Sequence, residues 1–517
     1  MITTNTIKLI GIDAIPVTIE CQISNGIGIH IVGLADEAVK ESLLRTITAL
    51  MATGHHITGK KIIINLAPAD LNKSGSGYDL PFAISLLAEQ GDLQVSDLDQ
   101  WLIFGELALD GSIRSVPGSL QAAMTAVGNG YKCIIPFADA EEVKAFVGDA
   151  PVYAPAALAE AVQVIKDQSS LPTIAEMEFK ENKANDDSVW DSIIGQESAK
   201  RALEIAAAGG HHVLIMGVPG SGKTSLAKAF TEILPPMTRE EALVNAAIYS
   251  ASGRGYNACY GAYRRPFRSP HISCSFAALL GGGSSTHILP GEVSLANNGV
   301  LYLDEFCDIP KNKLDALRGP MEDKKVVISR LKGVVEFPAN FQLVASSNPC
   351  PCGYYGEGDR CTCTPGQRAA YLSRISGPVF DSIAVQIWVH PVPDTVIEKN
   401  AVTYDNAATV AKRVVAAREI QKKRFENEAF KVNDQMTAKD LERYANLDED
   451  CKDLMEKLIN QLGLSARSYS RILKIARTIA DLDGSDNIRT HHLAEAASYR
   501  FLDRMSNLTE TQRTWTH

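Results

Sequence analysis

Residues 213–225 read VLIMGVPGSGKTS, and this stretch decides the fold of the chain around it. The apolar run before Gly217 predicts a buried strand, and the run from Ser225 to Leu234 has the periodicity of a helix. Between them, residues 217–224 have the spacing of a phosphate-binding P-loop. A strand, a glycine-rich loop and a helix in this order predict a nucleotide-binding α/β domain.

The loop predicts how ATP would be bound. Its glycines let backbone N–H groups surround the α- and β-phosphates, and the helix that follows turns the positive end of its dipole toward the anion. We expect Lys223 to reach the β- and γ-phosphates and the Thr224 hydroxyl to bind Mg²⁺. The predicted nucleotide-binding residues are Gly217, Val218, Pro219, Gly220, Ser221, Gly222, Lys223, Thr224 and Ser225.

A second apolar run ends in two carboxylates. Residues 299–305 read GVLYLDE, which is typical of a buried parallel strand. Ligands of open α/β sheets bind at the carboxyl ends of the strands. We therefore expect Asp304 to help hold Mg²⁺ and Glu305 to orient or deprotonate the water that attacks ATP.

A third apolar run, residues 341–348, reads FQLVASSN and ends in a polar amide. If its strand lies beside the strand that ends at Asp304, Asn348 can hydrogen-bond the γ-phosphate or the attacking water. An asparagine before a proline is also a common turn residue, so the position in isolation leaves both interpretations open.

Composition and charge set the class of protein. The 517 residues, 45% of them hydrophobic, are enough for several domains with cores of their own. The net charge is −10, but residues 1–170 hold 10 basic and 19 acidic side chains, whereas residues 191–517 hold 39 and 37. The second part can therefore carry a local basic groove for a polyanion.

No apolar run reaches membrane-spanning length, and the first residues do not form a signal peptide, so we expect a cytoplasmic protein without a membrane partner. Ten cysteines in a chain of this length are too sparse for a disulfide scaffold.

The chain divides into four predicted parts. Residues 1–168 alternate short β-rich runs with helical patterns and predict a compact α+β domain. Residues 169–188 are polar and read as a linker, and residues 189–394 form the α/β core. Residues 395–510 are rich in helical periodicity and poor in glycine, which predicts an all-α lid. In the first part, strands are expected at 6–12, 16–23, 27–32, 61–66 and 101–106, and helices at 36–52 and 80–90.

Several longer blocks resemble one family. They are RPFRSPH at 265–271, PGEVSLA at 290–296, NPCPCG at 348–353, RISGP at 374–378 and LSAR at 464–467. With these blocks the chain resembles the magnesium chelatase-like AAA+ proteins of the ComM/YifB family over nearly its whole length. The blocks NLAPADL at 65–71 and GYDLP at 77–81 resemble that family's Lon-protease-like domain, which has the ribosomal S5 domain 2-like fold.

The resemblance implies an AAA+ core with a helix-2 insert and a magnesium chelatase-type helical lid. It further implies an ATP-driven ring of hexameric type and, in the studied branch of the family, a DNA helicase. That helicase extends branch migration when incoming single strands are integrated, so DNA and recombination proteins are the expected partners.

The resemblance also assigns nucleotide-sensing residues. Asn348 matches the first sensor position. Arg467 matches the second sensor, which would contact the γ-phosphate of its own subunit, and Arg471 one turn later is the runner-up.

The trans-acting arginine finger departs from the family pattern. Where the family reads LDRID, residues 380–384 read FDSIA, so Ser382 stands at the expected arginine. Arg374, or Arg318, would then supply the charge from a neighbouring subunit. Loss of such an arginine costs on the order of 10³ to 10⁵ in rate, so without a replacement the protein would bind ATP better than it hydrolyses it.

Two basic segments are candidates for DNA contact. Residues 253–271 interleave arginines with aromatic residues and contain no acidic residue, which suits a single-stranded surface. The alternative is a solvated loop whose arginines pair with nearby carboxylates, or with ATP across a subunit interface. Residues 326–337 predict a hairpin that resembles the pore hairpin of helix-2-insert proteins, or else an exposed hairpin with lysines that protect its edge. The DNA-contact candidates are Arg264, Arg265, Arg268, Lys325, Arg330 and Lys332.

Two cysteine pairs suggest a structural metal. Cys350 and Cys352, with Cys361 and Cys363, bracket a short polar loop, so four thiolates could converge on one tetrahedral Zn²⁺. One-residue spacing is tighter than usual, and buried thiols or a disulfide between the pairs are the alternatives, the latter disfavoured in the cytosol.

Three other functions are compatible with parts of the sequence. A Lon-like domain suggests a protease, but the position of the nucleophilic serine falls on Gly77, and no lysine can be assigned as a base for the adjacent Ser76, so no peptidase activity is expected. A metal-chelatase-type motor subunit and a weakly hydrolysing AAA+ remodelling scaffold are the alternatives to the DNA motor.

Overall fold

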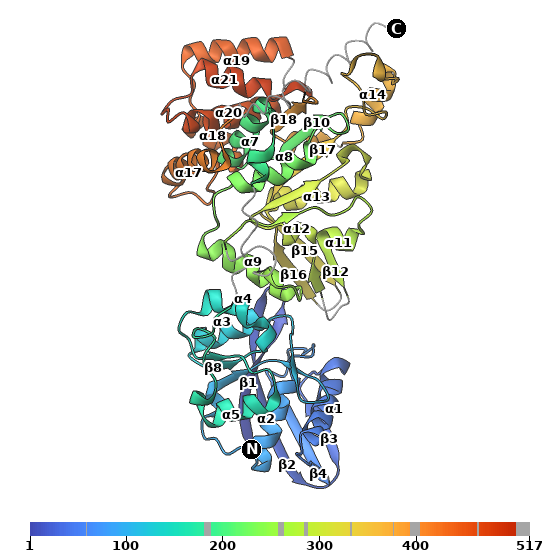
Figure 1. Cartoon of the computed structure of the whole chain (residues 1–517), viewed down its shortest axis with the longest axis vertical. Helices are drawn as coiled ribbons and strands as arrows, with labels where there is room; N and C mark the ends of the chain where they lie inside the picture. Colours follow the sequence, from blue (N-terminus) through green and yellow to red (C-terminus); the bar gives the residue numbers. More distant parts are fainter. Residues whose placement is uncertain are drawn as a thin grey trace.

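The computed structural model describes residues 1–57, 59–179, 188–256, 263–283, 288–330, 333–375, 377–392, 404–462 and 465–502. Figure 1 shows an elongated molecule with three regions along its long axis: the N-terminal region at one end, a sheet-containing core in the middle and a helical region at the other end. Among the described residues, no helix combines the length and the apolar character needed to cross a membrane.

The N-terminal region is built on a seven-stranded mixed sheet in the order β3-β4-β2-β1-β5-β8-β9. Its strands are β1 (Ile2–Ile10), β2 (Asp13–Asn25), β3 (Gly28–Val32), β4 (Lys60–Ala67), β5 (Trp101–Ile103), β8 (Lys132–Ile134) and β9 (Val152–Tyr153). Its main helices are α1 (Glu37–Ala52), α2 (Asp79–Gln90), α3 (Ser119–Asn129), α4 (Ala140–Val147) and α5 (Leu158–Lys166). The predicted α+β character is confirmed for this region.

Predicted strand boundaries are wrong at the first run, which begins earlier at Ile2, and at 101–106, where β5 ends at Ile103 and a separate strand, β6, covers Glu106–Leu107. The strand expected to continue to residue 12 ends at Ile10, where it pairs with Asp13 of β2. Gly11 has φ +63° and lies in the short turn between β1 and β2. Glycine adopts this left-handed conformation without a steric penalty, so the hairpin turns within a run whose apolar residues read as continuous strand.

The core contains a five-stranded sheet in the order β11-β14-β17-β10-β18, and all its strands are parallel. The strands are β10 (Val213–Gly217), β11 (Phe267–Arg268), β14 (Val300–Leu303), β17 (Gln342–Ser347) and β18 (Val385–Val389). The helices around this sheet include α7 (Glu197–Gly209), α8 (Lys223–Ala229), α9 (Arg239–Ala251), α13 (Lys311–Asp323), α14 (Pro365–Leu372) and α15 (Gly377–Ser382). The predicted α/β core is confirmed, as is the predicted placement of β17 beside β14.

Two small hairpins project from the core. They are β12 (Gly281–Gly283) with β13 (Ile288–Pro290), and β15 (Lys325–Arg330) with β16 (Gly333–Pro338). The second confirms the hairpin predicted from the sequence, and its connecting residues 331–332 lie outside the described part of the chain.

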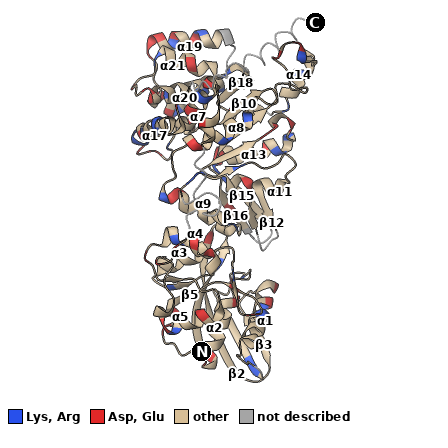
Figure 2. Cartoon of the chain, viewed as in Figure 1, with Lys and Arg blue, Asp and Glu red and all other residues tan. Residues whose placement is uncertain are grey.

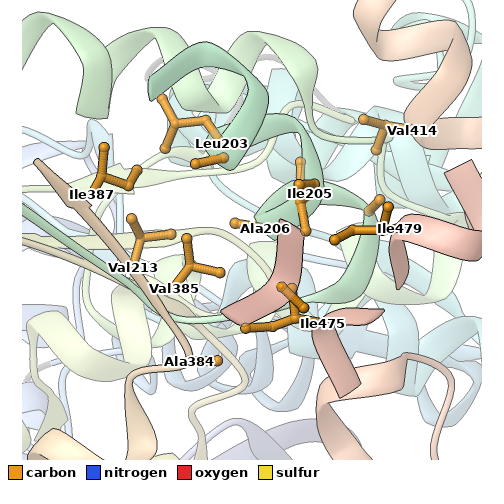
Figure 3. Packing of buried hydrophobic residues seen from close by; sticks show 14 of the residues in the cluster. Leu203, Ile205, Ala206, Val213, Ala384, Val385, Ile387, Val414, Ile475 and Ile479 are labelled. Carbon is orange, nitrogen blue, oxygen red and sulfur yellow. The ribbon is translucent and has the colours of Figure 1, made fainter. Parts of the chain in front are cut away.

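The lid helices pack directly on the sheet. Figure 3 shows Leu203 and Ile205 of α7 in one apolar cluster with side chains of the sheet and of the lid. The lid helices are α17 (Ala407–Arg424), α18 (Ala438–Tyr444), α19 (Glu449–Leu462), α20 (Ala466–Leu482) and α21 (Thr490–Ser498). Because Val414 of α17 and Ile475 of α20 belong to the same cluster, the lid position is coupled to the sheet through a shared core.

The N-terminal region contacts the core at two places. Helix α3 lies against α9, where Gln121 Nε2 donates to the Ala247 carbonyl at 2.8 Å. The β1–β2 turn lies against the second hairpin, because a Cβ added to Gly11 would be 2.7 Å from Val335 Cγ1. The N-terminal region therefore touches both α9 and the hairpin expected to contact DNA.

The shared core predicts different effects for two neighbouring valines of α17. Val414 is fully buried, whereas Val415 is 37% exposed. We expect Val414→Ala to destabilise the folded lid by about 2 kcal/mol through lost apolar burial and the resulting cavity. Val415→Ala should change stability by less than about 0.5 kcal/mol. Urea unfolding followed by circular dichroism measures both, and equal effects would contradict the shared core.

Candidate functional site

The P-loop joins β10 to α8 in a conformation that requires glycine. A Cβ on Gly217 would lie 2.4 Å from the carbonyl oxygen of Val389 in the neighbouring strand. Gly222, immediately before α8, has φ +87°. The chain can therefore turn sharply from the strand into the helix, with Lys223 as the first residue of α8.

The Lys223 ammonium is held by the loop itself. Lys223 Nζ donates to the carbonyls of Gly217 at 2.8 Å and Val218 at 3.0 Å, and to Asn348 Oδ1 at 3.2 Å. Burial lowers the pKa of Lys223, and the negative charge of Asp304 opposes this. Lys223 and Asn348, predicted from separate motifs, thus lie within hydrogen-bond distance at one edge of the sheet.

A hydrogen-bonded chain connects the two predicted magnesium ligands. Thr224 Oγ1 lies 3.2 Å from Tyr302 Oη, which lies 2.8 Å from Ser346 Oγ. Ser346 Oγ in turn donates to Asp304 Oδ1. Hydroxyl and carboxylate oxygens are the donors that Mg²⁺ prefers, so this set fits the ion.

Tyr302 and Ser346 were not predicted as site residues. Burial raises the pKa of Tyr302, which keeps its hydroxyl protonated and able to donate. In sequence, Tyr302 stands in an apolar strand and reads as core. The one sequence feature that could have indicated its role is that Tyr302 is an aromatic residue with a hydroxyl group, two positions before Asp304.

Glu305 lies at the exposed end of β14. Its φ is +51°, a left-handed conformation, and its backbone N–H donates to Asp304 Oδ1 at 2.9 Å. Such a conformation costs a residue with a side chain on the order of 1–3 kcal/mol and is typical of functional sites. The abrupt turn after the strand leaves both carboxylates exposed.

The lid arginines lie beside the expected finger position. Arg467 Nη1 donates to Asp381 Oδ2 at 2.6 Å, and Arg471 Nε donates to the Asp381 carbonyl at 3.1 Å. Both line a cavity of about 380 Å³ together with Arg318 and Ser382. Since none of the lining residues comes from the P-loop, the structure groups Arg467 with Ser382 and not with Lys223.

Arg374 is held within its own chain. Its Nη1 donates to Asp308 Oδ1 at 2.9 Å, and Tyr371 Oη donates to Asp308 Oδ2 at 2.8 Å. The Arg374 side chain is nevertheless 55% exposed, so its guanidinium can be reached from outside.

The four predicted cysteines come together directly after β17. The Sγ atoms of Cys350, Cys352 and Cys361 are 3.3, 3.8 and 3.7 Å apart, and with Cys363 all four lie within 4.8 Å of one another. A tetrahedral ZnS₄ site with Zn–S bonds of about 2.3 Å places its sulfurs about 3.8 Å apart, so the geometry fits Zn²⁺.

Two features tie this cysteine cluster to its surroundings. The backbone N–H of Tyr354 lowers the pKa of the Cys352 thiol to about 6, which favours the thiolate that a metal requires. The loop also approaches the P-loop, since a Cβ on Gly353 would lie 3.1 Å from side-chain carbons of Pro219.

Two of the arginines predicted to contact DNA are engaged within the chain. Arg265 Nη2 donates to Glu241 at 3.0 Å, and its other nitrogens donate to backbone carbonyls. Arg268 makes two hydrogen bonds to Glu292, at 2.6 and 2.7 Å. Arg264 is exposed and stays a candidate, whereas the ring of Tyr256 is buried and cannot stack on a base.

On the second hairpin, Lys325 pairs with Glu336 at 2.9 Å, and Arg330 is exposed. Lys332 lies outside the described residues. Figure 2 shows basic and acidic residues interspersed along the lid helices. DNA contact by these residues stays a prediction.

Known families match almost the whole chain. A model described as "Magnesium chelatase, subunit ChlI" matches residues 189–397. Models for "Subunit ChlI of Mg-chelatase" and "Magnesium chelatase, subunit ChlI C-terminal" match residues 19–139 and 405–500.

Individual proteins match over nearly the full length. The chain is 41% identical to the uncharacterized protein YifB of Salmonella typhimurium, with 97% of each chain covered. It is 42% identical to the competence protein ComM of Haemophilus influenzae, over 96% of this chain and 98% of that protein. A stretch of 54 residues is 46% identical to an archaeal Lon protease of Archaeoglobus fulgidus, but covers only 10% of this chain and 9% of that one.

The cysteine cluster predicts a metal content. The protein purified without added chelator should contain one zinc per chain by inductively coupled plasma mass spectrometry. Cys361→Ser should lose that zinc, because a three-sulfur site leaves the tetrahedron open. Cys274→Ser, at a half-exposed cysteine outside the cluster, should retain it. Absence of zinc from the wild-type protein, or equal loss in both variants, would contradict the site.

Proposed function

Because the chain belongs to the ComM/YifB family of magnesium chelatase-like AAA+ proteins, we propose that it is an ATP-driven ring motor acting on DNA. Within that class we favour a branch-migration helicase or translocase in recombination or natural transformation, because one relative is named a competence protein. The observation that carries the ATPase part is the meeting of Lys223, Asn348 and the Thr224–Tyr302–Ser346–Asp304 chain at one sheet edge.

The contacts of the site suggest how its residues act on ATP. When ATP binds, its phosphate oxygens would replace the carbonyls of Gly217 and Val218 as hydrogen-bond acceptors for Lys223. The Lys223 ammonium would need little movement to make this exchange. Asn348, bonded to Lys223, is placed to hydrogen-bond the γ-phosphate, and Glu305 is the base for the attacking water. Thr224 and Asp304 would hold Mg²⁺, whose charge stabilises the charge that develops on the phosphates.

We further propose that Arg467 acts on the ATP of a neighbouring subunit. Arg467 was predicted to contact the ATP of its own subunit, but it lines one cavity with Ser382 and Arg318, the two residues expected at the subunit interface, and this supports a role in trans. A guanidinium from the lid could then supply the charge that Ser382 lacks. Arg374 remains a second candidate, because more than half of its side chain is exposed.

The proposal also covers the domains of the chain, its location and its oligomeric state. We take residues 1–168 as a Lon-protease-like domain without peptidase activity, 189–394 as the AAA+ core and 395–510 as the lid, in a cytoplasmic hexameric ring. The serine at position 382 specifically favours one other function, a remodelling scaffold that binds ATP and hydrolyses it slowly.

Mixing two inactive variants tests whether Arg467 acts in trans. Lys223→Ala should abolish ATP turnover, and Arg467→Ala should lower it by on the order of 10³ if Arg467 serves as the finger. In mixed rings, an Arg467→Ala subunit offers an intact P-loop to the intact Arg467 of a Lys223→Ala neighbour. We therefore expect the mixture to regain ATPase activity that neither variant has alone.

A mixture as inactive as its components, at concentrations where the wild-type protein forms rings, would place Arg467 on the P-loop of its own subunit. The same mixture prepared with Arg374→Ala in place of Arg467→Ala tests the second candidate. Regained activity there would identify Arg374 as the finger.

DNA-stimulated turnover separates the motor from the scaffold. Single-stranded or forked DNA should increase the ATPase rate of the wild-type protein. Arg264→Ala should raise the DNA concentration for half-maximal stimulation on the order of tenfold, since one charge-assisted contact is lost. Arg114→Ala, an exposed arginine of the N-terminal region, is the matched control and should have no effect. A rate that no DNA form changes would favour the scaffold.

A further inference from the structure

Lys324 occupies an unusual position at the end of α13. Its φ is +57°, in the left-handed region where glycine normally ends a helix. Two backbone hydrogen bonds hold it there: its N–H donates to the Pro320 carbonyl at 3.0 Å, and its carbonyl accepts from Ala339 at 2.8 Å. A lysine in this conformation is strained, which points to a role for its side chain.

The Lys324 ammonium lacks a direct partner. No hydrogen bond or ion pair joins it to another residue in the described part of the chain, although the side chain is half-buried. Burial lowers the pKa of Lys324, and the charge of Asp434 only partly opposes this. A partly buried cation without a hydrogen-bonded counterion is unfavourable, so a further negative charge beside Lys324 would stabilise the site.

Two cavities meet at this lysine, on the boundary between core and lid. One has a volume of about 380 Å³ and includes Arg471 and Lys474 of α20. The other, of about 260 Å³, includes Arg265 and Arg418 and reaches Gly299 and Gln342, before β14 and at the start of β17. The P-loop lies at the opposite, carboxyl ends of these parallel strands.

Positive charge dominates the walls of the two cavities. His212 is neutral there, because burial lowers its pKa to about 3. The cations are Lys324, Arg471, Lys474, Arg265, Arg418 and Lys431, and the carboxylates are Glu322, Asp434 and Glu241.

The three carboxylates already have partners. Asp434 accepts from Arg471 at 3.0 Å, Glu241 from Arg265 at 3.0 Å and Glu322 from Arg318 at 3.0 Å. Four cations, Lys324, Lys474, Arg418 and Lys431, are therefore left without a carboxylate partner among the described residues, and Lys431 donates to the backbone carbonyls of Phe425 and Glu428.

Two of these cations are buried enough for their pKa values to fall, and repulsion from neighbouring cations adds to this effect. Burial lowers the pKa of Lys474 to about 8, and Asp434 only partly offsets it. Burial, with repulsion from Arg265, lowers the pKa of Arg418 to about 9. Their hydrogen bonds go to backbone carbonyls: Lys474 donates to Asp434 and Arg418 to Ala207.

We propose that Lys324 forms, with Lys474 and Arg418, a phosphate-binding site between the core and the lid, separate from the P-loop. A phosphate group carries close to two negative charges and several acceptor oxygens, which suits Lys324, a residue that lines both cavities, with Lys474 in the first and Arg418 in the second. Cavities of a few hundred Å³ hold a phosphate or a diphosphate. The phosphate can belong to a DNA backbone or to a free phosphate compound.

The site has a structural consequence for the second hairpin. Lys324 directly precedes β15, and its carbonyl bonds to the residue that follows β16. An anion bound between Lys324 and α20 would therefore join the base of that hairpin to the lid.

The test uses a variant with a disabled P-loop, so that phosphate binding there does not contribute to the measured signal. Inorganic pyrophosphate is titrated by calorimetry into the full-length Lys223→Ala protein, which lacks the P-loop lysine. We expect one remaining site per chain, and Lys324→Gly in this background should weaken it by about tenfold or more. Glycine suits the backbone at this position, so the variant should unfold at the same temperature as its parent or higher.

Lys311→Ala is the matched control, because it removes one exposed positive charge from the other end of the same helix. It should leave pyrophosphate binding unchanged. If the Lys223→Ala protein binds no pyrophosphate, or binds it equally well with Lys324→Gly, the proposal is wrong. This result is independent of ATP hydrolysis, so it leaves the proposed motor function untouched.

A second titration identifies the source of the phosphate. Binding of a fluorescein-labelled single-stranded oligonucleotide is followed by anisotropy, with and without pyrophosphate. If Lys324→Gly weakens oligonucleotide binding and pyrophosphate competes with it, the site holds a backbone phosphate. If Lys324→Gly affects pyrophosphate alone, the site holds a free phosphate compound. Both results support the site.

Discussion

The parallel pairing of β14, β17 and β10 is the constraint on which the rest of the site depends. The pairs Leu303–Ala345 and Met216–Ser347 set the relative positions of the three strand ends. Each strand ends in a different chemical group, and parallel strands present these ends at one edge. A one-residue shift of β17 would move Ser346 to the other face and break the link between Tyr302 and Asp304.

The sequence predicted those parts of the site whose chemistry lies within a single motif. Asp304 and Asn348 each directly follow a recognisable apolar strand, Lys223 follows the glycine-rich loop after a third, and the sheet order then brings them together. Tyr302 could not be found in this way, because its role depends on Thr224 of α8 and Ser346 of β17, which are distant in sequence. The same applies to Arg265, whose partner Glu241 is distant in sequence, so its ion pair only becomes visible in three dimensions.

The lid shows why a sequence motif can identify a nucleotide-sensing arginine without revealing whether it contacts the ATP of its own subunit or that of a neighbouring subunit. The LSAR block identifies Arg467 as a sensor, but its surroundings depend on how α20 packs. The core shared by α7, α17 and α20 fixes that packing and brings the start of α20 to Asp381. Apolar periodicity predicts that such helices are buried on one face, and it does not predict which element they meet. The contact of Gly11 with the second hairpin could not be predicted either, because it also depends on how two regions distant in sequence pack together.

Charge along the boundary between core and lid connects the lid position to bound anions. Arg467 and Arg471 stand at one end of this boundary, and Lys324 stands further along it, where Asp434 accepts from Arg471. Repulsion among half-buried cations favours separation of the two surfaces, because separation lets water solvate them. An anion placed between the surfaces removes that repulsion and favours closure. The apolar core that the sheet and the lid share opposes separation of the two surfaces, so the charge of the boundary acts against a fixed hydrophobic contact.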